Sequence, residues 1–192
     1  MEYTLAIDDA PETIPAGTGI LLLHPSTGAT DRIDTEFLAT DTDQLLVVST
    51  RTTAREVKQK LEHYEVDESK AHVLDTLSVE RGYTRRWSDD VRYVSAPDDI
   101  DGIVEQIRGF LDTHDGKRRV SFDSITELIY YADEERAYDA VERILELLVE
   151  HEAVGLFHLA EGVHDDAVVD RFRAAFDATI ELDQDGTVTT DF

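Results

Sequence analysis

The segment "GILLLHPSTGATDRIDTEFL", Gly19 to Leu38, decides the fold class. It opens with an uninterrupted apolar run, which is typical of a strand buried on both faces of a sheet. A loop with Pro, Ser, Thr and Gly follows, and the pattern after it predicts the start of a helix. Phosphate-binding loops occupy this place between a buried strand and a helix. The segment therefore raises the question of whether the chain holds a nucleotide.

The chain length and composition indicate one globular domain over residues 1–192, of which 41% are apolar. No apolar tract is long enough to cross a bilayer, so we expect no membrane partner. The acidic N-terminus lacks the basic region and apolar run of a signal peptide. The sequence contains no cysteine, which excludes disulfides, thiolate catalysis and cysteine-bound zinc. We therefore expect a soluble cytoplasmic protein.

The net charge of −25 arises from 43 acidic against 18 basic residues. Acidic residues are spread along the chain between regular apolar segments, which is not the pattern of a disordered acidic tail. We interpret the charge as adaptation to molar salt, where the Debye length falls to about 3 Å and self-repulsion is screened. Duplex DNA binding relies on Lys and Arg that neutralise phosphates. We therefore do not expect a generic nucleic-acid partner.

Strand and helix patterns alternate along the chain. Buried or alternating strand patterns are predicted at 19–23, 44–50, 71–76, 91–96, 117–124 and 153–162. Helical spacing of apolar residues occurs at 54–66, 98–114, 125–151 and 164–176, with a break in the third near Ala132 and Asp133. Two alternating runs around "DQDG" predict a β-hairpin at 178–192. This alternation predicts an α/β fold with a mostly parallel sheet, helices on both of its faces and a C-terminal β-hairpin.

The loop after the first buried strand keeps only part of a phosphate-binding motif. The motif GxxxxGK[ST] uses glycines to curl backbone N–H groups around phosphates, a lysine for the outer phosphates and a hydroxyl for Mg²⁺. Aligned on Gly28, the hydroxyl is that of Thr30, but Leu23 replaces the first glycine and Ala29 replaces the lysine. Arg32 lies two residues further on and can supply some positive charge, although not from the lysine's place.

Asp123 closes the apolar strand pattern "VSFDS". Because ligands of doubly wound sheets bind beyond the carboxyl ends of the strands, Asp123 is expected to face the loop around Gly28. A Walker B aspartate helps to hold Mg²⁺ from such a position. The alternative interpretation, which we favour, is a polar strand-end residue that caps the helix beginning near Ser124.

The segments 19–38, 45–67, 72–76 and 118–166 together resemble the KaiC-like group of RecA-superfamily ATPases. They are most similar to small haloarchaeal RecA-like proteins labelled HTR-like, with a degenerate Walker A motif. "FDSITELI" is the most specific piece, and the similarity covers residues 15–182, the expected core. The resemblance implies a RecA-like P-loop NTPase fold, an ATP-binding core and frequent assembly into hexameric rings.

Carried over residue by residue, the resemblance matches only Gly28, Thr30 and Asp123 to nucleotide-site positions. Family ATPases place an acidic pair that activates water after their second strand. The corresponding stretch here begins with Arg51, and Glu56 is its first carboxylate. Both the phosphate lysine and the base are absent, so we expect a pseudo-ATPase with no cofactor, and Mg-ATP binding is the alternative.

Other candidate chemistry is sparse. The histidines show no metal-ligand spacing, and His158 within an apolar strand is expected to be a hydrogen-bonded core residue. The serines lack a GxSxG nucleophile elbow. Lys117, Arg118 and Arg119 are expected to form a solvated strand entry. One basic-aromatic cluster stands out as a possible partner contact, because Arg and aromatic residues are frequent interface anchors and stacking platforms; it comprises Arg81, Tyr83, Arg85, Arg86 and Trp87.

Three hypotheses for function follow. The first is a catalytically inactive RecA/KaiC-like protein that acts through a protein partner or a homo-oligomer. The second is a nucleotide binder or slow ATPase that uses Arg32 or an arginine from a neighbouring subunit. The third is an accessory protein that contacts nucleic acid through residues 81–87. We favour the first, because function has to come from a site and the nucleotide site is mostly erased.

Overall fold

The computed structural model describes residues 1–27, 29–83 and 88–192. Its strands are β1 (Glu2–Thr4), β2 (Thr13–Pro15), β3 (Gly19–Pro25), β4 (Gln44–Ser49), β5 (Ala71–Asp75), β6 (Val91–Tyr93), β7 (Arg118–Asp123), β8 (Val154–Glu161), β9 (Ala178–Leu182) and β10 (Val188–Asp191). Its helices are α1 (Asp31–Ala39), α2 (Ala54–His63), the short 3₁₀ helix η1 (Glu68–Lys70), α3 (Ile100–Thr113), α4 (Ile125–Tyr131), α5 (Glu134–Glu150) and α6 (Asp166–Arg173). None of these described helices is long and apolar enough to cross a membrane.

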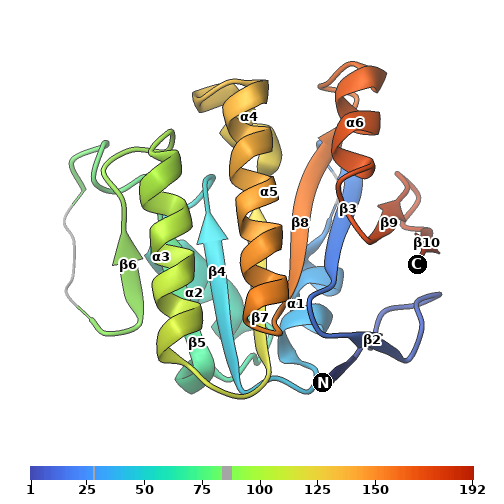
Figure 1. Ribbon diagram of the computed structural model, residues 1–192, viewed down its shortest axis with the longest axis horizontal. Coiled ribbons are helices and arrows are strands. Elements are labelled where there is room, and N and C mark those ends of the chain that lie inside the picture. The colour runs from blue at the N-terminus through green and yellow to red at the C-terminus, as the bar shows by residue number, and fades with distance from the viewer. Residues whose placement is uncertain (28, 84–87) are drawn as a thin grey trace.

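Eight strands form one sheet in the order β10-β9-β3-β8-β7-β4-β5-β6 (Figure 1). All neighbouring pairs in it are parallel except β9 and β10, which form an antiparallel hairpin with Val188 opposite Leu182. The turn of this hairpin needs a positive φ at Gly186, which has no Cβ to oppose it. The predicted α/β class, the mostly parallel sheet and the C-terminal hairpin are confirmed.

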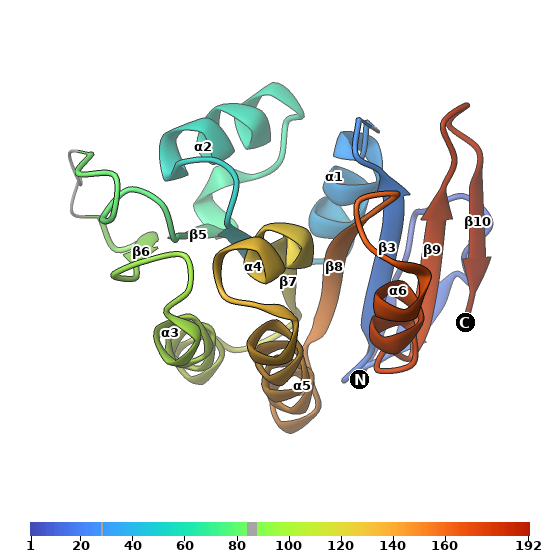
Figure 2. The same cartoon turned by 90° about the horizontal axis from the view of Figure 1, so that it is seen from above.

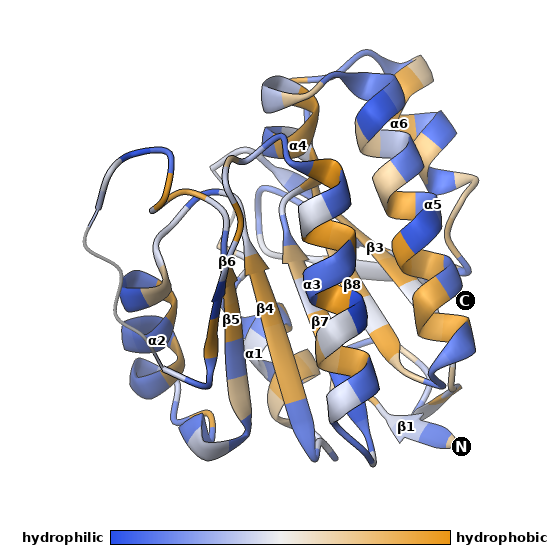
Figure 3. Ribbon diagram, turned by 60° about the vertical axis from the view of Figure 1, so that its left-hand side comes forward, coloured by the Kyte–Doolittle hydropathy of each residue, from blue (hydrophilic) through white to orange (hydrophobic). Residues whose placement is uncertain are grey.

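The sheet separates two apolar cores. Helices α3 to α6 cover one face, whereas α1, α2 and the β1–β2 hairpin cover the other (Figure 2). Strand β3 supplies both cores, because alternate side chains of a strand point to opposite faces. Leu21 and Leu23 pack on the α5 side, and Ile20 and Leu22 pack on the α1 side. Figure 3 shows the strands as mainly hydrophobic and the helices as mixed, as this two-sided burial requires.

The helix boundaries follow from local capping. The side chain of Asp99 accepts a hydrogen bond from the Gly102 N–H and caps α3. Asp133 accepts from the Arg136 N–H and caps α5. This cap separates α5 from α4, so the predicted break near Ala132 and Asp133 is confirmed.

The positive strand entry at 117–119 is not the solvated segment that we expected. Arg119 is fully buried, and its guanidinium lies 5.3 Å from the Tyr3 ring centroid and 5.1 Å from that of Phe37. It donates one hydrogen bond of 2.7 Å to the Thr4 carbonyl, while Nε and Nη1 have no partner among the described residues. Burial lowers the pKa of Arg119 to about 10. The expectation failed because the N-terminal hairpin, which the sequence did not reveal, covers this end of β7.

Candidate functional site

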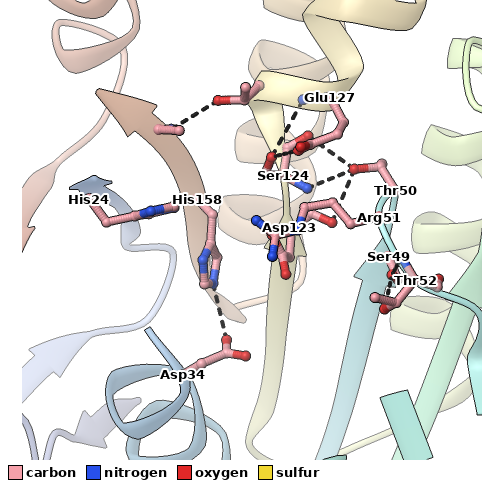
Figure 4. Close-up of polar contacts among 12 residues, drawn as sticks. His24, Asp34, Ser49, Thr50, Arg51, Thr52, Asp123, Ser124, Glu127 and His158 are labelled. Carbon is pink, nitrogen blue, oxygen red and sulfur yellow. Dashed lines mark hydrogen bonds and ion pairs between the residues drawn. The ribbon is translucent and has the colours of Figure 1, made fainter. Parts of the chain in front are cut away.

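The candidate site lies at the edge of the sheet where β3, β7 and β4 end (Figure 4). Strand β3 ends at Pro25, and β7 ends at Asp123, which pairs in register with Ser49 at the end of β4. Parallel strands bring their carboxyl ends to one edge, and ligands of open α/β sheets bind there. The structure therefore places Asp123 at the sheet edge where the phosphate-binding loop of this fold would lie.

The loop 26–30 leads directly into α1. Gly28 lies outside the described residues. Ala29 is exposed, and Thr30 occupies the N-cap position of α1 without a side-chain capping bond. The first turn of α1 carries Asp31 and Asp34. A helix N-terminus ordinarily attracts anions, but the carboxylate of Asp31, whose side chain is 45% exposed, opposes the approach of a phosphate there.

Arg32 is engaged by carboxylates outside the loop. Its guanidinium forms an ion pair with Asp8 in the N-terminal segment and lies 3.5 Å from Glu36 one turn along α1. The side chain is 61% exposed. Arg32 is thus already paired with two carboxylates on the surface of α1.

Asp123 is paired with Arg51, which lies two residues after the end of β4. Arg51 Nε lies 3.6 Å from Asp123 Oδ1, and this oxygen has no hydrogen-bond donor among the described residues. The backbone is tied across the same gap, because the Thr50 N–H donates to the Asp123 carbonyl and the Ser124 N–H donates to Thr50 Oγ1. An arginine therefore stands beside the aspartate at the carboxyl ends of β4 and β7.

The expected capping role of Asp123 is wrong. Ser124 is the N-cap of α4, and its Oγ accepts from the Glu127 N–H at 3.4 Å and contacts the Glu127 carboxylate. Asp123 contributes no capping bond because its carboxylate faces Arg51. The peptide bond between Asp123 and Ser124 is cis.

The first carboxylate after β4, Glu56, is used for capping. Glu56 Oε2 accepts hydrogen bonds of 2.8 Å from both the N–H and the hydroxyl of Thr53, which completes a capping box at the start of α2. These hydrogen bonds, with a smaller contribution from nearby Arg81, lower the pKa of Glu56. Glu56 therefore serves as a hydrogen-bond acceptor at the start of α2. It also lines the groove described below.

Beneath the loop lies a buried ion pair between Asp34 on α1 and His158 on β8 (Figure 4). Asp34 Oδ1 accepts from His158 Nε2 at 3.2 Å and from Ser121 Oγ at 2.7 Å. Its Oδ2 accepts from Lys60 Nζ at 3.1 Å. The prediction that His158 is a hydrogen-bonded core residue is confirmed.

The charges of this pair stabilise each other. Burial works to raise the pKa of Asp34, but the charge and hydrogen bond of His158, with Lys60 and Ser121, hold it well below its ordinary range. Burial likewise works to lower the pKa of His158, and the carboxylates of Asp123 and Asp34 outweigh it, so this pKa is raised. Each side chain therefore favours the ionised form of the other within the protein interior.

A second buried histidine lies next to this pair. The ring centroids of His24 and His158 are 5.6 Å apart in an edge-to-face arrangement. His24 Nδ1 donates to the Pro25 carbonyl at 2.9 Å, and burial lowers its pKa, so this ring is neutral. Across residues 1–27, 29–83 and 88–192, no group of three or more His, Asp or Glu side chains is arranged to hold a metal ion.

A separate groove of about 1180 Å³ opens between α2 and the segment that leads from β5 to β6. Arg81 and Tyr83 of the basic-aromatic cluster line it, together with Arg55 and Lys58 of α2. Arg85, Arg86 and Trp87 lie outside the described residues. The structure thus places the described members of the cluster on a concave surface beside α2, apart from Asp123.

Sequence reasoning missed Asp34 and Asp75. Asp34 occupies the apolar stripe of α1 with Phe37 and Leu38, and a carboxylate at such a position was the available signal. Asp75 ends β5 and accepts hydrogen bonds from the N–H groups of Ala54, Leu77 and Ser78 and from the Ser78 hydroxyl. It is 1% exposed and holds the floor of the groove in place.

The arrangement of sheet, strand-end aspartate and loop defines a protein with the RecA/KaiC-like P-loop ATPase fold. A KaiC-like protein from Pyrococcus horikoshii is similar at 16% identity with a TM-score of 0.63, covering 94% of this chain and 79% of that one. An uncharacterised P. horikoshii protein in complex with an unknown peptide has 15% identity and a TM-score of 0.65, covering 92% and 83%. The flagellar accessory protein FlaH from Methanocaldococcus jannaschii has 15% identity and a TM-score of 0.63, covering 94% and 80%.

The chain belongs to a family of unknown function, DUF7090, whose model matches residues 1–192. A search of the curated proteins gives no match. The structural neighbours are too distant in sequence to carry more than the fold.

Proposed function

We propose that this protein is a RecA/KaiC-like domain that does not hydrolyse ATP and acts through contacts with other proteins, as a regulatory or assembly component. The observation that carries the proposal is the ion pair between Arg51 and Asp123, with Nε and Oδ1 3.6 Å apart. A guanidinium beside the strand-end aspartate offsets the charge that would attract Mg²⁺. The same arginine stands where an acidic base is needed to activate water.

The surroundings of loop 26–30 support the same conclusion. Ala29 replaces the lysine that would contact the outer phosphates, and the first turn of α1 exposes the carboxylate of Asp31. Arg32, the nearest cation in the sequence, is paired with Asp8 and Glu36. A triphosphate would meet carboxylates rather than compensating charge, so these residues do not fit Mg-ATP.

The protein-contact part of the proposal draws on the groove beside α2 and on the solved neighbours. One neighbour was crystallised in complex with an unknown peptide, so a protein of this fold can hold a peptide ligand. The net charge of −25 suits a salt-rich cytoplasm, where we place this function.

The test is thermal unfolding and ATP hydrolysis in multimolar KCl, with and without Mg-ATP. A ligand at about 100 times its Kd adds about 2.7 kcal/mol of stability. At about 2–4 °C per kcal/mol for a chain of this size, that is a rise in Tm of roughly 5–11 °C. We expect no rise and no phosphate release.

The Asp123→Ala variant is the control for this test. We expect it to behave as the unaltered chain does toward Mg-ATP, because Asp123 holds no nucleotide-bound metal in the proposed function. Mg²⁺-dependent hydrolysis that disappears in Asp123→Ala would overturn the proposal and establish a working ATPase.

A further inference from the structure

The groove between α2 and the segment from β5 to β6 is large enough to hold a segment of polypeptide chain. Its volume of about 1180 Å³ exceeds the roughly 300–1,000 Å³ that holds a small molecule. Figure 2 shows α2 along one side, with β5 and β6 beside it. Val91 and Tyr93, which are alternate residues of the terminal strand β6, both line the groove. An extended peptide can therefore lie along β6 with α2 as the opposite wall.

The carboxylates of the groove are already engaged by the protein itself. Glu56 accepts two hydrogen bonds from Thr53, and Asp75 accepts four from the backbone and hydroxyl groups around it. Asp75 is also fully enclosed. Neither carboxylate needs a cation from a ligand.

Among the described residues, neither arginine of the groove forms an ion pair, although the charge of Arg81 acts on the nearby Glu56 carboxylate. Arg55 makes no hydrogen bond or ion pair with the described residues, although it is exposed on the first turn of α2. Arg81 is exposed, and its side-chain hydrogen bonds with Tyr131 and Tyr83 raise its pKa. Lys58 is the exception, because Asp90 pairs with it. The groove is lined by three cations, Arg55, Lys58 and Arg81, against two carboxylates, Glu56 and Asp75, so its lining is far less negative than a chain with a net charge of −25 as a whole.

Exposed tyrosines extend the same surface over α4. Tyr83 is 51% exposed and Tyr130 is 83% exposed. Tyr131 contacts Tyr130 edge-to-face, with ring centroids 5.3 Å apart, and is linked to Arg81 by a hydrogen bond. Tyr and Arg are enriched among the residues that anchor protein interfaces. Exposed aromatic rings beside arginines therefore favour a protein ligand with both acidic and apolar side chains.

We propose that this groove binds an extended acidic peptide segment of a partner protein, with its carboxylates on Arg55 and Arg81 and its apolar side chains on Tyr83 and the neighbouring tyrosines. The inference rests on the proposed function, because it names the class of partner for the protein-contact role. Charge complementarity selects the acidic partner: the rest of this acidic surface repels such a segment, whereas the groove attracts it.

The test measures fluorescence anisotropy of a labelled peptide of alternating Glu and Phe residues with the full chain, at the lowest KCl concentration that keeps it folded. The matched peptide has Gln in place of each Glu, so it lacks the carboxylates without gaining a charge that the acidic surface attracts. We expect the Glu peptide to bind, the Gln peptide not to bind, and added KCl to weaken the complex. Equal binding of both peptides, or no binding of the Glu peptide, overturns the inference.

Two variants locate the site, and one controls for charge. Arg55→Glu and Tyr83→Ala are each expected to weaken Glu-peptide binding by about tenfold or more. Arg108→Glu makes the same charge change at an exposed arginine of α3 and should bind as the unaltered chain does. Circular dichroism verifies that each variant is folded. Equal affinities for Arg55→Glu and Arg108→Glu overturn the inference.

Failure here is distinguishable from failure of the proposed function. A chain that neither hydrolyses ATP nor binds the acidic peptide overturns only this inference. A chain that hydrolyses Mg-ATP overturns the proposed function, and the groove assignment is then judged by the Arg55→Glu result alone. If single-stranded nucleic acid binds and Arg55→Glu abolishes that binding, while the Glu peptide does not bind, the assigned class of partner is wrong.

Discussion

Replacement of Asp34 by Asn tests the buried ion pair most directly. The Asp34 side chain is 5% exposed and accepts hydrogen bonds from His158, Ser121 and Lys60. Asn has nearly the same size, so no cavity forms, but the carboxylate charge is lost. Removing one partner of a buried pair typically costs about 3–5 kcal/mol. We expect about 3 kcal/mol, because His158 can lose its proton and the Asn oxygen can still accept from Ser121.

Asp31→Asn is the matched control. Asp31 lies in the same turn of α1 and pairs with the same Lys60 at 2.7 Å, but its side chain is 45% exposed. Exposed pairs are worth about 0–1 kcal/mol, so this variant should lose no more than that. The two variants make the same chemical change, and burial is the main difference between them.

Urea unfolding at constant molar KCl measures both free energies of unfolding, and the expected loss for Asp34→Asn corresponds to a fall in Tm of roughly 6–12 °C. The double variant Asp34→Asn with His158→Gln should lose less than the sum of the single variants, because the two side chains interact. A loss for Asp34→Asn within about 1 kcal/mol of that for Asp31→Asn would refute an ionised buried pair.

Two further predictions concern pH and packing. The pKa of His158 is raised in the folded protein by the carboxylates of Asp123 and Asp34, against burial, so its stabilising contribution is complete below about pH 6.5 and is lost as the pH rises through the raised value. The stability advantage of the unaltered chain over His158→Gln should therefore shrink as the pH rises above about 6.5 in urea titrations, and a constant difference would contradict the protonated state. A Cβ added at Gly155 would lie 2.7 Å from Leu148 Cδ1 and 2.7 Å from Phe157 Cε2, so Gly155→Ala should cost about 1–3 kcal/mol. Gly109→Ala within α3, where the added Cβ meets only Arg92 Nη1 at 3.3 Å, should instead gain up to about 1 kcal/mol of stability. Calorimetry measures the Tm of both variants, and equal changes in Tm would contradict this prediction.

Much of the fold was predictable because its elements have strong local patterns. Strand β3 is a continuous apolar run since both of its faces are buried, and α3 repeats its apolar residues at helical spacing behind the cap Asp99. The N-terminal hairpin was not predictable, because β1 and β2 have three residues each and only one buried side chain apiece. Arg119 was misassigned for the same reason: Tyr3 and Thr4, which cover it together with Phe37 of α1, belong to that hairpin.

The candidate site was predictable only in its position. A strand followed by a Gly-containing loop and a helix placed the loop, and the motif "FDSITELI" placed Asp123 at a strand end. The pairing of Asp123 with Arg51 was not visible, because these residues come from β7 and from the loop after β4, which become neighbours only through the order of the strands. The groove was not visible either, because α2 and the segment after β5 are separate in the sequence and are brought together by the order of the strands.

By itself, the sequence determined the α/β class, the main strands and helices, the C-terminal hairpin and the absence of a lysine from the loop after β3. These properties depend on periodicity, propensity and residue identity, which are local. The tertiary structure alone decided which charged groups meet: Asp34 and His158 lie 124 positions apart, and Arg119 lies under the N-terminal hairpin. Periodicity indicates that a face is buried but not what covers it, because the partner is set by sheet order and by the packing of distant segments.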